Sequence, residues 1–382
     1  MEILRIHVVL SDCITVEGHA QRVVMLPFTG TCEGSLFTGS ILPGGVDTQR
    51  IEADGRCALS ARYALAGTDC EGRACRLFIE NMAVTSPGAE ALTRPCIRTD
   101  SPALRWLETA DLTGRIETAD GHIDIVLYSE DTPHRKRIAL RRGGLTLHAC
   151  LEKKVDGPCP LVLMLHGFGG RMDVGGGFMQ EWSDALTQAG MATLRMDFNG
   201  HGESEGRFRD MTPYNEIEDA ATLLQYAMTL PDVTDIFVLG HSQGGVIAGM
   251  LSGYYHDVVK KLVMLVPAAS LKTDAQQGTC MGVKYDPKKV PESVLIGEKQ
   301  VGGLYFRMAQ TLPIYEVTAH FRGPAMAVIA GQDGVVATES IRRYGAYMPS
   351  CRMVEKPTLN HGLAGAEHDE IVREVVDFLR HA

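Results

Sequence analysis

The segment that most constrains this chain is G-H-S-Q-G at residues 240–244, which has the form G-x-S-x-G. An apolar run typical of a buried strand precedes it at residues 235–239, and small residues typical of a helix follow at 245–251. A serine in a tight strand-to-helix turn exposes its hydroxyl group, and the first N–H groups of the helix point toward the group that it attacks. The pattern therefore predicts that Ser242 is a nucleophile; a plain structural turn is the alternative.

Strand-like and helix-like segments alternate along the C-terminal part of the chain. Continuous apolar strands separated by helices are typical of a parallel sheet that is covered on both faces, so we predict the α/β class. Together with the G-x-S-x-G turn, this arrangement indicates an α/β-hydrolase fold. Residues from about 268 to 320 interrupt the alternation, and we expect them to form an inserted cap over the sheet's C-terminal edge. The predicted strands are residues 161–165, 192–198, 235–239, 261–266, 325–330 and 351–356, and the predicted helices are residues 176–189, 215–228, 338–347 and 368–381.

The first part of the chain follows a different pattern, in which apolar and polar residues alternate with a period of two. Turn signals separate the alternating runs, and helical periodicity is nearly absent. Residues 1–130 are therefore predicted to form a separate all-β domain, a barrel or a sandwich. The polar segment 129–134 is the predicted boundary, and residues 134–382 form the second predicted domain. The clearest alternating runs are residues 1–10, 58–65, 76–81 and 122–128.

A serine nucleophile needs a base, and the base needs an acid that orients it. In an α/β-hydrolase the acid and the histidine follow the serine in that order, after later strands of the sheet. Asp333 comes directly after the predicted strand 325–330, and His361 lies between the last predicted strand and the last predicted helix. We predict Asp333 as the acid and His361 as the base. The alternatives are a turn-capping aspartate and an ordinary loop histidine.

Acyl transfer also needs donors that hold the negatively charged oxygen of the reacting ester. The segment H-G-F-G-G at residues 166–170 follows an apolar strand, where a hydrolase places its first donor. The backbone N–H groups of Phe168 and Gln243 are the predicted pair, and the glycines let the loop backbone approach the substrate.

Composition and charge exclude several other classes of protein. The chain has 37 basic and 47 acidic residues, a net charge of -10, and no long basic run, which argues against nucleic acid or an anionic membrane as a partner. A membrane-spanning run of about 18 apolar residues is missing. Residues 1–10 lack the features of a secretory signal, so a cytoplasmic location is expected. None of the ten cysteines has metal-binding spacing, and we expect neither a metal nor a cofactor.

Several segments resemble the cinnamoyl (feruloyl) esterases of gut and rumen bacteria. They are residues 166–169, 196–206, 240–246, 267–275, 302–310 and 312–317. The resemblance covers residues 134–382 and implies a cap that closes over an aromatic acyl group. At the matching positions it implies that Asp274 and Tyr305 hold phenolic hydroxyl groups. Gly167 is a further implied substrate contact. Met281 stands near the place where some relatives have a glutamine that contacts the second ring substituent, and methionine cannot donate there.

The N-terminal part is similar to a bacterial and fungal β-barrel family known only as a domain of unknown function. Residues 37–47 and 61–63 carry this similarity. It implies a fold but no activity, and binding of a small molecule, assembly of an oligomer and shielding of the cap all stay open.

Together these observations predict a serine carboxylesterase that hydrolyses hydroxycinnamate (feruloyl, caffeoyl or p-coumaroyl) esters, so that its partner is a small aromatic ester. A broader short-acyl or aryl carboxylesterase is the first alternative. A ligand-binding protein with an inactive hydrolase fold is an alternative of another class. The sequence leaves the alcohol part of the ester and the formation of a homodimer open.

Overall fold

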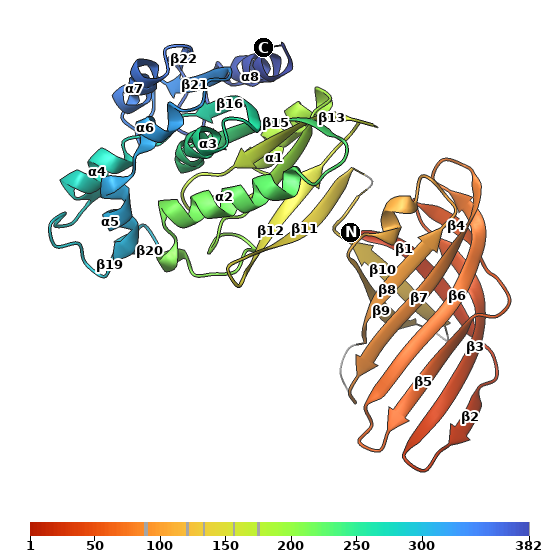
Figure 1. Ribbon diagram of the computed structural model, residues 1–382. Helices are drawn as coiled ribbons and strands as arrows, with labels where there is room; N and C mark the ends of the chain where they lie inside the picture. Colours follow the sequence, from red (N-terminus) through yellow and green to blue (C-terminus); the bar gives the residue numbers. More distant parts are fainter. Residues whose placement is uncertain (88–90, 120–121, 133, 156, 174–175, 382) are drawn as a thin grey trace. The chain divides into compact units, whose positions relative to one another are not determined.

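The computed structural model describes residues 1–382 except 88–90, 120–121, 133, 156, 174–175 and 382 (Figure 1). The chain divides into two compact units, Met1–Arg137 and Ile138–Ala382. The division falls shortly after the segment 129–134 that the sequence indicates as a boundary; Pro133 of that segment lies outside the described residues.

The N-terminal unit is an antiparallel sheet that closes on itself as a barrel (Figure 1). Strand β1 pairs with β10 on one side and with β3 on the other, which joins the two ends of the sheet. This confirms the predicted all-β fold. The strands are β1 (Glu2–Leu10), β2 (Ile14–Glu17), β3 (Gln21–Glu33), β4 (Phe37–Ile41), β5 (Val46–Glu52), β6 (Cys57–Asp69), β7 (Ala74–Thr85), β8 (Leu92–Thr99), β9 (Leu112–Ala119) and β10 (His122–Ser129), with a 3-10 turn at Arg105–Glu108.

Alternation of side chains explains why these segments form a barrel with its own core. Along β7, Cys75, Leu77 and Ile79 are buried, whereas Arg76 and Phe78 between them are exposed. Successive side chains of a strand point to opposite faces, so one face of β7 lines the interior and the other faces outward.

The C-terminal unit contains one sheet in the order β11-β12-β14-β13-β15-β16-β21-β22. From β14 to β22 neighbouring strands are parallel, and β12 joins β14 in the antiparallel sense. This is the predicted α/β arrangement. The strands are β11 (Arg135–Arg142), β12 (Leu145–Glu152), β13 (Cys159–Leu165), β14 (Ala192–Met196), β15 (Val233–His241), β16 (Val259–Leu265), β21 (Ala325–Ala330) and β22 (Arg352–Lys356).

Helices connect the strands of this sheet and pack against it. Helix α1 contacts α8, whereas α3 contacts α2 and α6. Helix α2 begins earlier than the predicted residue 215, because Thr212 caps it by accepting from the Asn215 N–H and Pro213 takes the first helical position. The helices here are α1 (Phe178–Gln188), α2 (Pro213–Ala227), α3 (Gln243–Tyr254), α7 (Thr338–Tyr347) and α8 (His368–His381), with a 3-10 turn η2 at Phe208–Asp210.

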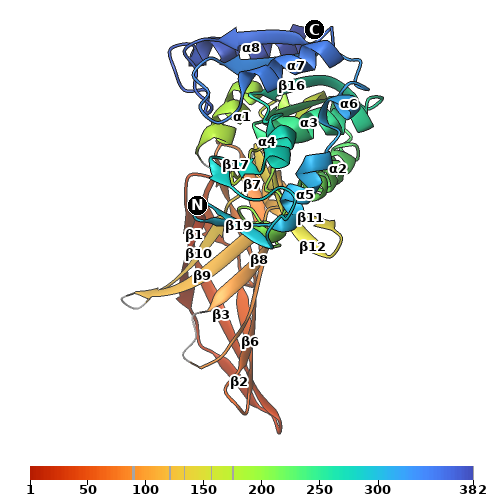
Figure 2. The ribbon, with the colours of Figure 1, turned by 90° about the vertical axis from the view of Figure 1, so that its left-hand side faces the viewer.

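Short elements between β16 and β21 occupy the stretch that interrupts the sequence pattern, and they gather beside α2 and α3 (Figures 1 and 2). They are α4 (Leu271–Gln277), β17 (Thr279–Cys280), β18 (Val283–Lys284), β19 (Ser293–Ile296), β20 (Lys299–Gly302), α5 (Gly303–Thr311) and α6 (Ile314–Thr318). Val294, Val301 and Phe306 form part of a small separate core, against which Phe168 and Phe208 from earlier loops of the C-terminal unit pack. This core ties the inserted segment to the loop after β13.

No helix within the described residues is long and apolar enough to cross a lipid bilayer.

Candidate active site

Ser242 occupies a strained turn between β15 and α3. Its φ of 55° and ψ of -122° are unusual for a residue with a side chain. A Cβ atom at Gly240 would lie 2.0 Å from the Gly244 carbonyl oxygen, and one at Gly244 would lie 2.3 Å from that of Leu165. Only glycine fits at either position, which explains the two glycines of the motif. The turn has the geometry of a nucleophile elbow.

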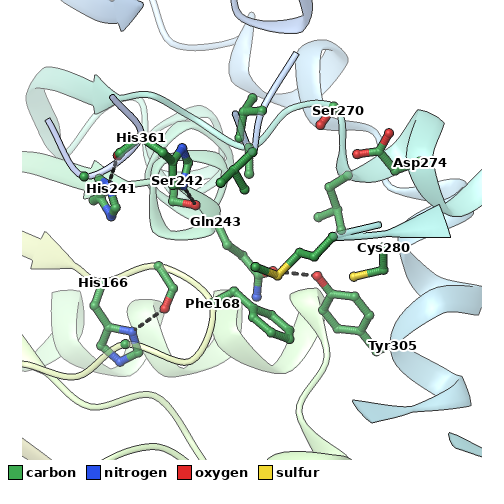
Figure 3. A pocket seen from close by; sticks show the side chains of 18 of the residues that line it. His166, Phe168, His241, Ser242, Gln243, Ser270, Asp274, Cys280, Tyr305 and His361 are labelled. Carbon is green, nitrogen blue, oxygen red and sulfur yellow. Dashed lines mark hydrogen bonds between the residues drawn. The ribbon is translucent and has the colours of Figure 1, made fainter. Parts of the chain in front are cut away.

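His361 and Asp333 continue from Ser242 as a chain of hydrogen bonds. His361 Nε2 lies 2.9 Å from Ser242 Oγ (Figure 3), and His361 Nδ1 lies 2.8 Å from Asp333 Oδ2. Asp333 follows β21 and His361 follows β22, so the three residues come from the carboxyl ends of parallel strands. The sheet therefore brings together residues that stand more than 100 positions apart in sequence.

Asp333 is held in one orientation and kept ionised. Its side chain is fully buried, and its Oδ1 accepts from the N–H groups of Val335 and Val336, at 2.8 Å each. Burial alone would raise the pKa of this carboxyl, but the hydrogen bonds from His361 and from the two N–H groups lower it below its usual value. An anionic Asp333 keeps the proton of His361 on Nδ1 and leaves the Nε2 lone pair facing Ser242.

Two buried histidines shape the loop that carries Phe168. His166 accepts from the Phe198 N–H at Nε2 and places Nδ1 2.8 Å from the Gly167 carbonyl oxygen. His201 accepts from the Gly169 N–H at Nε2. Burial lowers the pKa of His166 to about 4 and that of His201 to about 3, so both rings are neutral near pH 7. Neutral rings can accept these bonds.

The same loop runs directly beside Ser242. A Cβ atom at Gly167 would lie 2.9 Å from the Ser242 Cβ, which is closer than real side chains approach. On the other side, the N–H of Gln243 belongs to the first turn of α3, where backbone donors have no partner within the helix. Both predicted donors, the N–H groups of Phe168 and Gln243, are thus on backbone that flanks Ser242.

The side chain of Gln243 is fixed by two buried residues from other elements. Its Oε1 accepts from the Tyr305 hydroxyl group of α5 at 2.6 Å (Figure 3), and its Nε2 donates to Glu216 of α2 at 2.5 Å. Burial raises the pKa of Glu216 to about 8, and nearby Asp219 adds to the shift. Sequence reasoning missed Glu216, although a carboxylate on the apolar face of the helix 215–228 is an unusual feature that marks it.

The ring of His241, which precedes Ser242 in the sequence, is held by contacts to His361 and Phe178. Its Nε2 lies 2.9 Å from the His361 carbonyl oxygen, and its ring packs on Phe178 with the ring centres 4.4 Å apart. Burial lowers its pKa to about 4. His241 therefore supports the loop that carries His361 and is not placed to act as the base.

A cavity of about 490 Å³ opens in front of Ser242. Asp274 of α4 and Tyr305 of α5 both line it, whereas Met281 lies at its rim with 60% of its surface exposed. Burial raises the pKa of Asp274, although its hydrogen bond to the Ser270 side chain opposes the shift. The sequence-predicted residues that reach this cavity are Gly167, Phe168, Ser242, Gln243, Asp274, Met281, Tyr305 and His361; Asp333 stands behind His361.

Comparisons with known proteins match the two units separately. Residues 156–299 match a family described as serine aminopeptidase, S33, and residues 2–129 match a family described as protein of unknown function (DUF3237). The structure of Est1E from Butyrivibrio proteoclasticus with bound ferulic acid is 29% identical, with a TM-score of 0.61 over 63% of this chain and 97% of Est1E. The C-terminal unit has the α/β-hydrolase fold. The N-terminal barrel matches the DUF3237 family over nearly its whole length.

Curated relatives match shorter stretches of the chain. A putative hydrolase of Bacillus subtilis, YtaP, is 32% identical in a match that covers 25% of this chain and 40% of YtaP. A UPF0311 protein of Clostridium acetobutylicum is 31% identical in a match that covers 24% of this chain and 65% of that protein. The chain thus spans less than two-thirds of each relative. The family matches and Est1E confirm the resemblances that the sequence motifs indicate for both units.

Proposed function

We propose that the α/β-hydrolase unit is a serine carboxylesterase that cleaves hydroxycinnamate esters. The observation that carries the proposal is the hydrogen-bonded chain Asp333–His361–Ser242 at the mouth of a cavity with a half-buried carboxyl group, Asp274, in its wall. The likeness to Est1E, whose structure holds ferulic acid, supports the same class of substrate.

In the first half of the proposed reaction, Ser242 Oγ attacks the ester carbonyl carbon while His361 Nε2 takes the hydroxyl proton. Asp333 stabilises the imidazolium that forms. The carbonyl oxygen becomes negatively charged and accepts from the N–H groups of Phe168 and Gln243. When the tetrahedral intermediate collapses, His361 gives its proton to the departing alcohol oxygen, and the acyl group stays on Ser242.

In the second half, water takes the place of the alcohol. His361 removes a proton from the water as its oxygen attacks the acyl carbon, and the same two N–H groups hold the charged oxygen. Collapse of this intermediate returns the proton to Ser242 Oγ and releases the hydroxycinnamic acid. Neither half of this scheme requires a cofactor.

The aromatic side chains that line the cavity favour an aromatic acyl group. Phe168 and Tyr305 meet edge to face with ring centres 5.9 Å apart, and Tyr305 packs on Phe306 in the same manner at 5.2 Å. Aromatic edges and faces of this kind pack well against a further ring. Asp274, whose carboxyl group faces the same cavity, can accept from a phenol O–H group.

Labelling and kinetics together test this proposal. A fluorophosphonate probe should form a covalent adduct on Ser242, and methyl ferulate, methyl caffeate and methyl p-coumarate should be hydrolysed faster than p-nitrophenyl butyrate relative to their uncatalysed rates. If the probe labels Ser242 but p-nitrophenyl butyrate is hydrolysed as well as the hydroxycinnamate esters, the broader esterase is favoured. Absence of both adduct and turnover favours the ligand-binding protein.

A further inference from the structure

The interior of the N-terminal barrel differs between its two ends. At one end the inward side chains Leu65 of β6, Leu77 of β7 and Ile97 of β8 are completely or almost completely buried. Toward the other end the inward positions of the same sheet, Leu59 of β6 and Ala83 of β7, are partly exposed. Solvent therefore reaches inward positions at this second end, the open end, but not at the first.

Between the two ends of the barrel, four polar side chains have buried atoms without a hydrogen-bond partner among the described residues. Tyr63, Asn81 and Thr93 are each at most 3% exposed. Among the described residues nothing hydrogen-bonds to the Tyr63 hydroxyl oxygen, Asn81 Oδ1, Thr93 Oγ1 or Oδ1 of Asp47. Leaving such a group without a hydrogen bond costs about 1–3 kcal/mol, and buried polar groups in folded proteins are nearly always satisfied.

Strand register brings these four groups into one zone of the interior. Asp47 of β5 lies opposite Ala61 of β6, and Ala61 lies opposite Asn81 of β7, so the row runs across three adjacent strands (Figure 1). Tyr63 is two positions from Ala61 and therefore shares its face.

Thr93 extends the same zone on β8. Asn81 is paired with Pro95 of β8, and Thr93 is two positions from Pro95 on the same face. On the neighbouring strand β9, a Cβ at Gly114 would lie only 2.2 Å from Thr93 Oγ1, so the glycine leaves room for this hydroxyl group.

We propose that the barrel binds a small neutral phenol with its hydroxyl group at this polar zone. Asp47 and Asn81 offer acceptors, and the Tyr63 and Thr93 hydroxyl groups can donate, which matches a hydroxyl group that both donates and accepts. Tyr63 and Phe28 pack edge to face with ring centres 5.3 Å apart, and Leu59 supplies apolar surface toward the open end, which suits an aromatic body. The Asp47 carboxyl group disfavours an anionic ligand.

Calorimetric titration of the full chain with 4-ethylphenol tests this site, with 4-ethylanisole as the ligand that lacks the donor. Tyr63→Phe removes one hydroxyl group and keeps the ring on Phe28, and Asn81→Leu removes a second partner. Asp274→Ala is the control, since it changes the hydrolase cavity alone. We expect each barrel variant to raise the Kd about tenfold, the cost of one lost hydrogen bond. Asp274→Ala should leave the Kd of the barrel site unchanged, and 4-ethylanisole should bind to the barrel more weakly.

Ester hydrolysis separates this site from the proposed function, because Tyr63→Phe should bind phenol poorly and retain wild-type kcat/KM on methyl ferulate. Folding of the variants is checked by circular dichroism, and Tyr63→Phe alone decides the matter if Asn81→Leu does not fold. Absence of binding by the wild-type chain would mean that water alone satisfies the four groups. Binding that is lost in Asp274→Ala but kept in Tyr63→Phe would place the phenol in the hydrolase cavity. Either result overturns the proposal.

Discussion

At the scale of single residues, Gln243 connects the proposed oxyanion site to Tyr305 of the inserted segment. Its backbone N–H is a proposed oxyanion donor, while its side chain is bonded to Tyr305 and Glu216. Asp274 lines the same cavity from α4, and its carboxyl group is hydrogen-bonded to Ser270 instead. Substitution of Asp274 should therefore lower activity on phenolic esters alone, whereas substitution of Tyr305 should lower activity on all esters.

Asp274→Ala is expected to lower kcat/KM for methyl ferulate by about 5- to 150-fold, the cost of one buried hydrogen-bond partner, and to leave p-nitrophenyl butyrate within a few-fold of wild type. Tyr305→Phe should lower turnover of both substrates, because its hydroxyl group also positions Gln243. Steady-state kinetics on the two esters measure this. Selective loss on methyl ferulate in Tyr305→Phe would show that Tyr305 acts on the phenol alone.

Glu216 should make the stability of the fold depend on pH. Its pKa is raised from 4.5 to about 8 by burial, so between these values the folded chain keeps a proton that the unfolded chain has lost. The free energy of unfolding then falls as pH rises through this window, by up to roughly 3 kcal/mol between pH 5 and 7. Glu216→Gln should remove this part of the decline, as measured by Tm against pH. If Tm fell with pH equally in the wild type and in Glu216→Gln, the raised pKa of Glu216 would be contradicted. Both proteins contain Asp219, so its titration does not account for a difference between them.

At the scale of elements, the elbow depends on how closely β13 approaches α3. A Cβ at Gly244 would meet the carbonyl oxygens of Leu165 and His166, so Gly244→Ala should destabilise the fold strongly and abolish ester hydrolysis. Gly345→Ala in α7 is the matched control. Its nearest neighbour is Met353 Cγ at 3.9 Å, and alanine should stabilise the helix by about 1 kcal/mol. Chemical denaturation of both variants measures the contrast, and equal stabilities would refute the packing argument.

Local pattern predicted most of the elements, because apolar runs and period-two alternation are properties of neighbouring residues. The strands 161–165 and 325–330 appear with little change as β13 and β21. Pattern did not predict the short strands β17 to β20, which are too brief to show a period and form only within the inserted segment. Helix starts were less well predicted than helix existence, as α2 shows.

The candidate site likewise contains residues that the sequence predicts and contacts that it does not. Chain order alone was enough to propose Ser242, Asp333 and His361, because parallel strands bring their carboxyl ends to one edge. Chain order could not predict the bonds of Gln243 to Tyr305 and Glu216, since these contacts join elements 62 and 27 positions apart. The orphaned polar groups of the barrel likewise emerge only when strand register is known.

At the scale of the whole molecule, the two units have separate cores, and all of the proposed catalytic residues lie in the second. A chain of residues 138–382 should therefore hydrolyse methyl ferulate with kcat/KM within a few-fold of the full protein. Activity assays on the soluble, folded truncation check this. A folded truncation without activity would show that the barrel contributes to the site.

The rate of methyl ferulate hydrolysis by the full-length wild-type chain and by Ser242→Ala tests the central claim most directly. The account predicts measurable turnover by the wild type and a decrease in kcat of about 10⁴–10⁶ in the variant with the fold intact, because the members of a triad act as a unit. Retention of more than about a tenth of the activity in Ser242→Ala, or a folded wild-type protein that releases no ferulic acid, would contradict it.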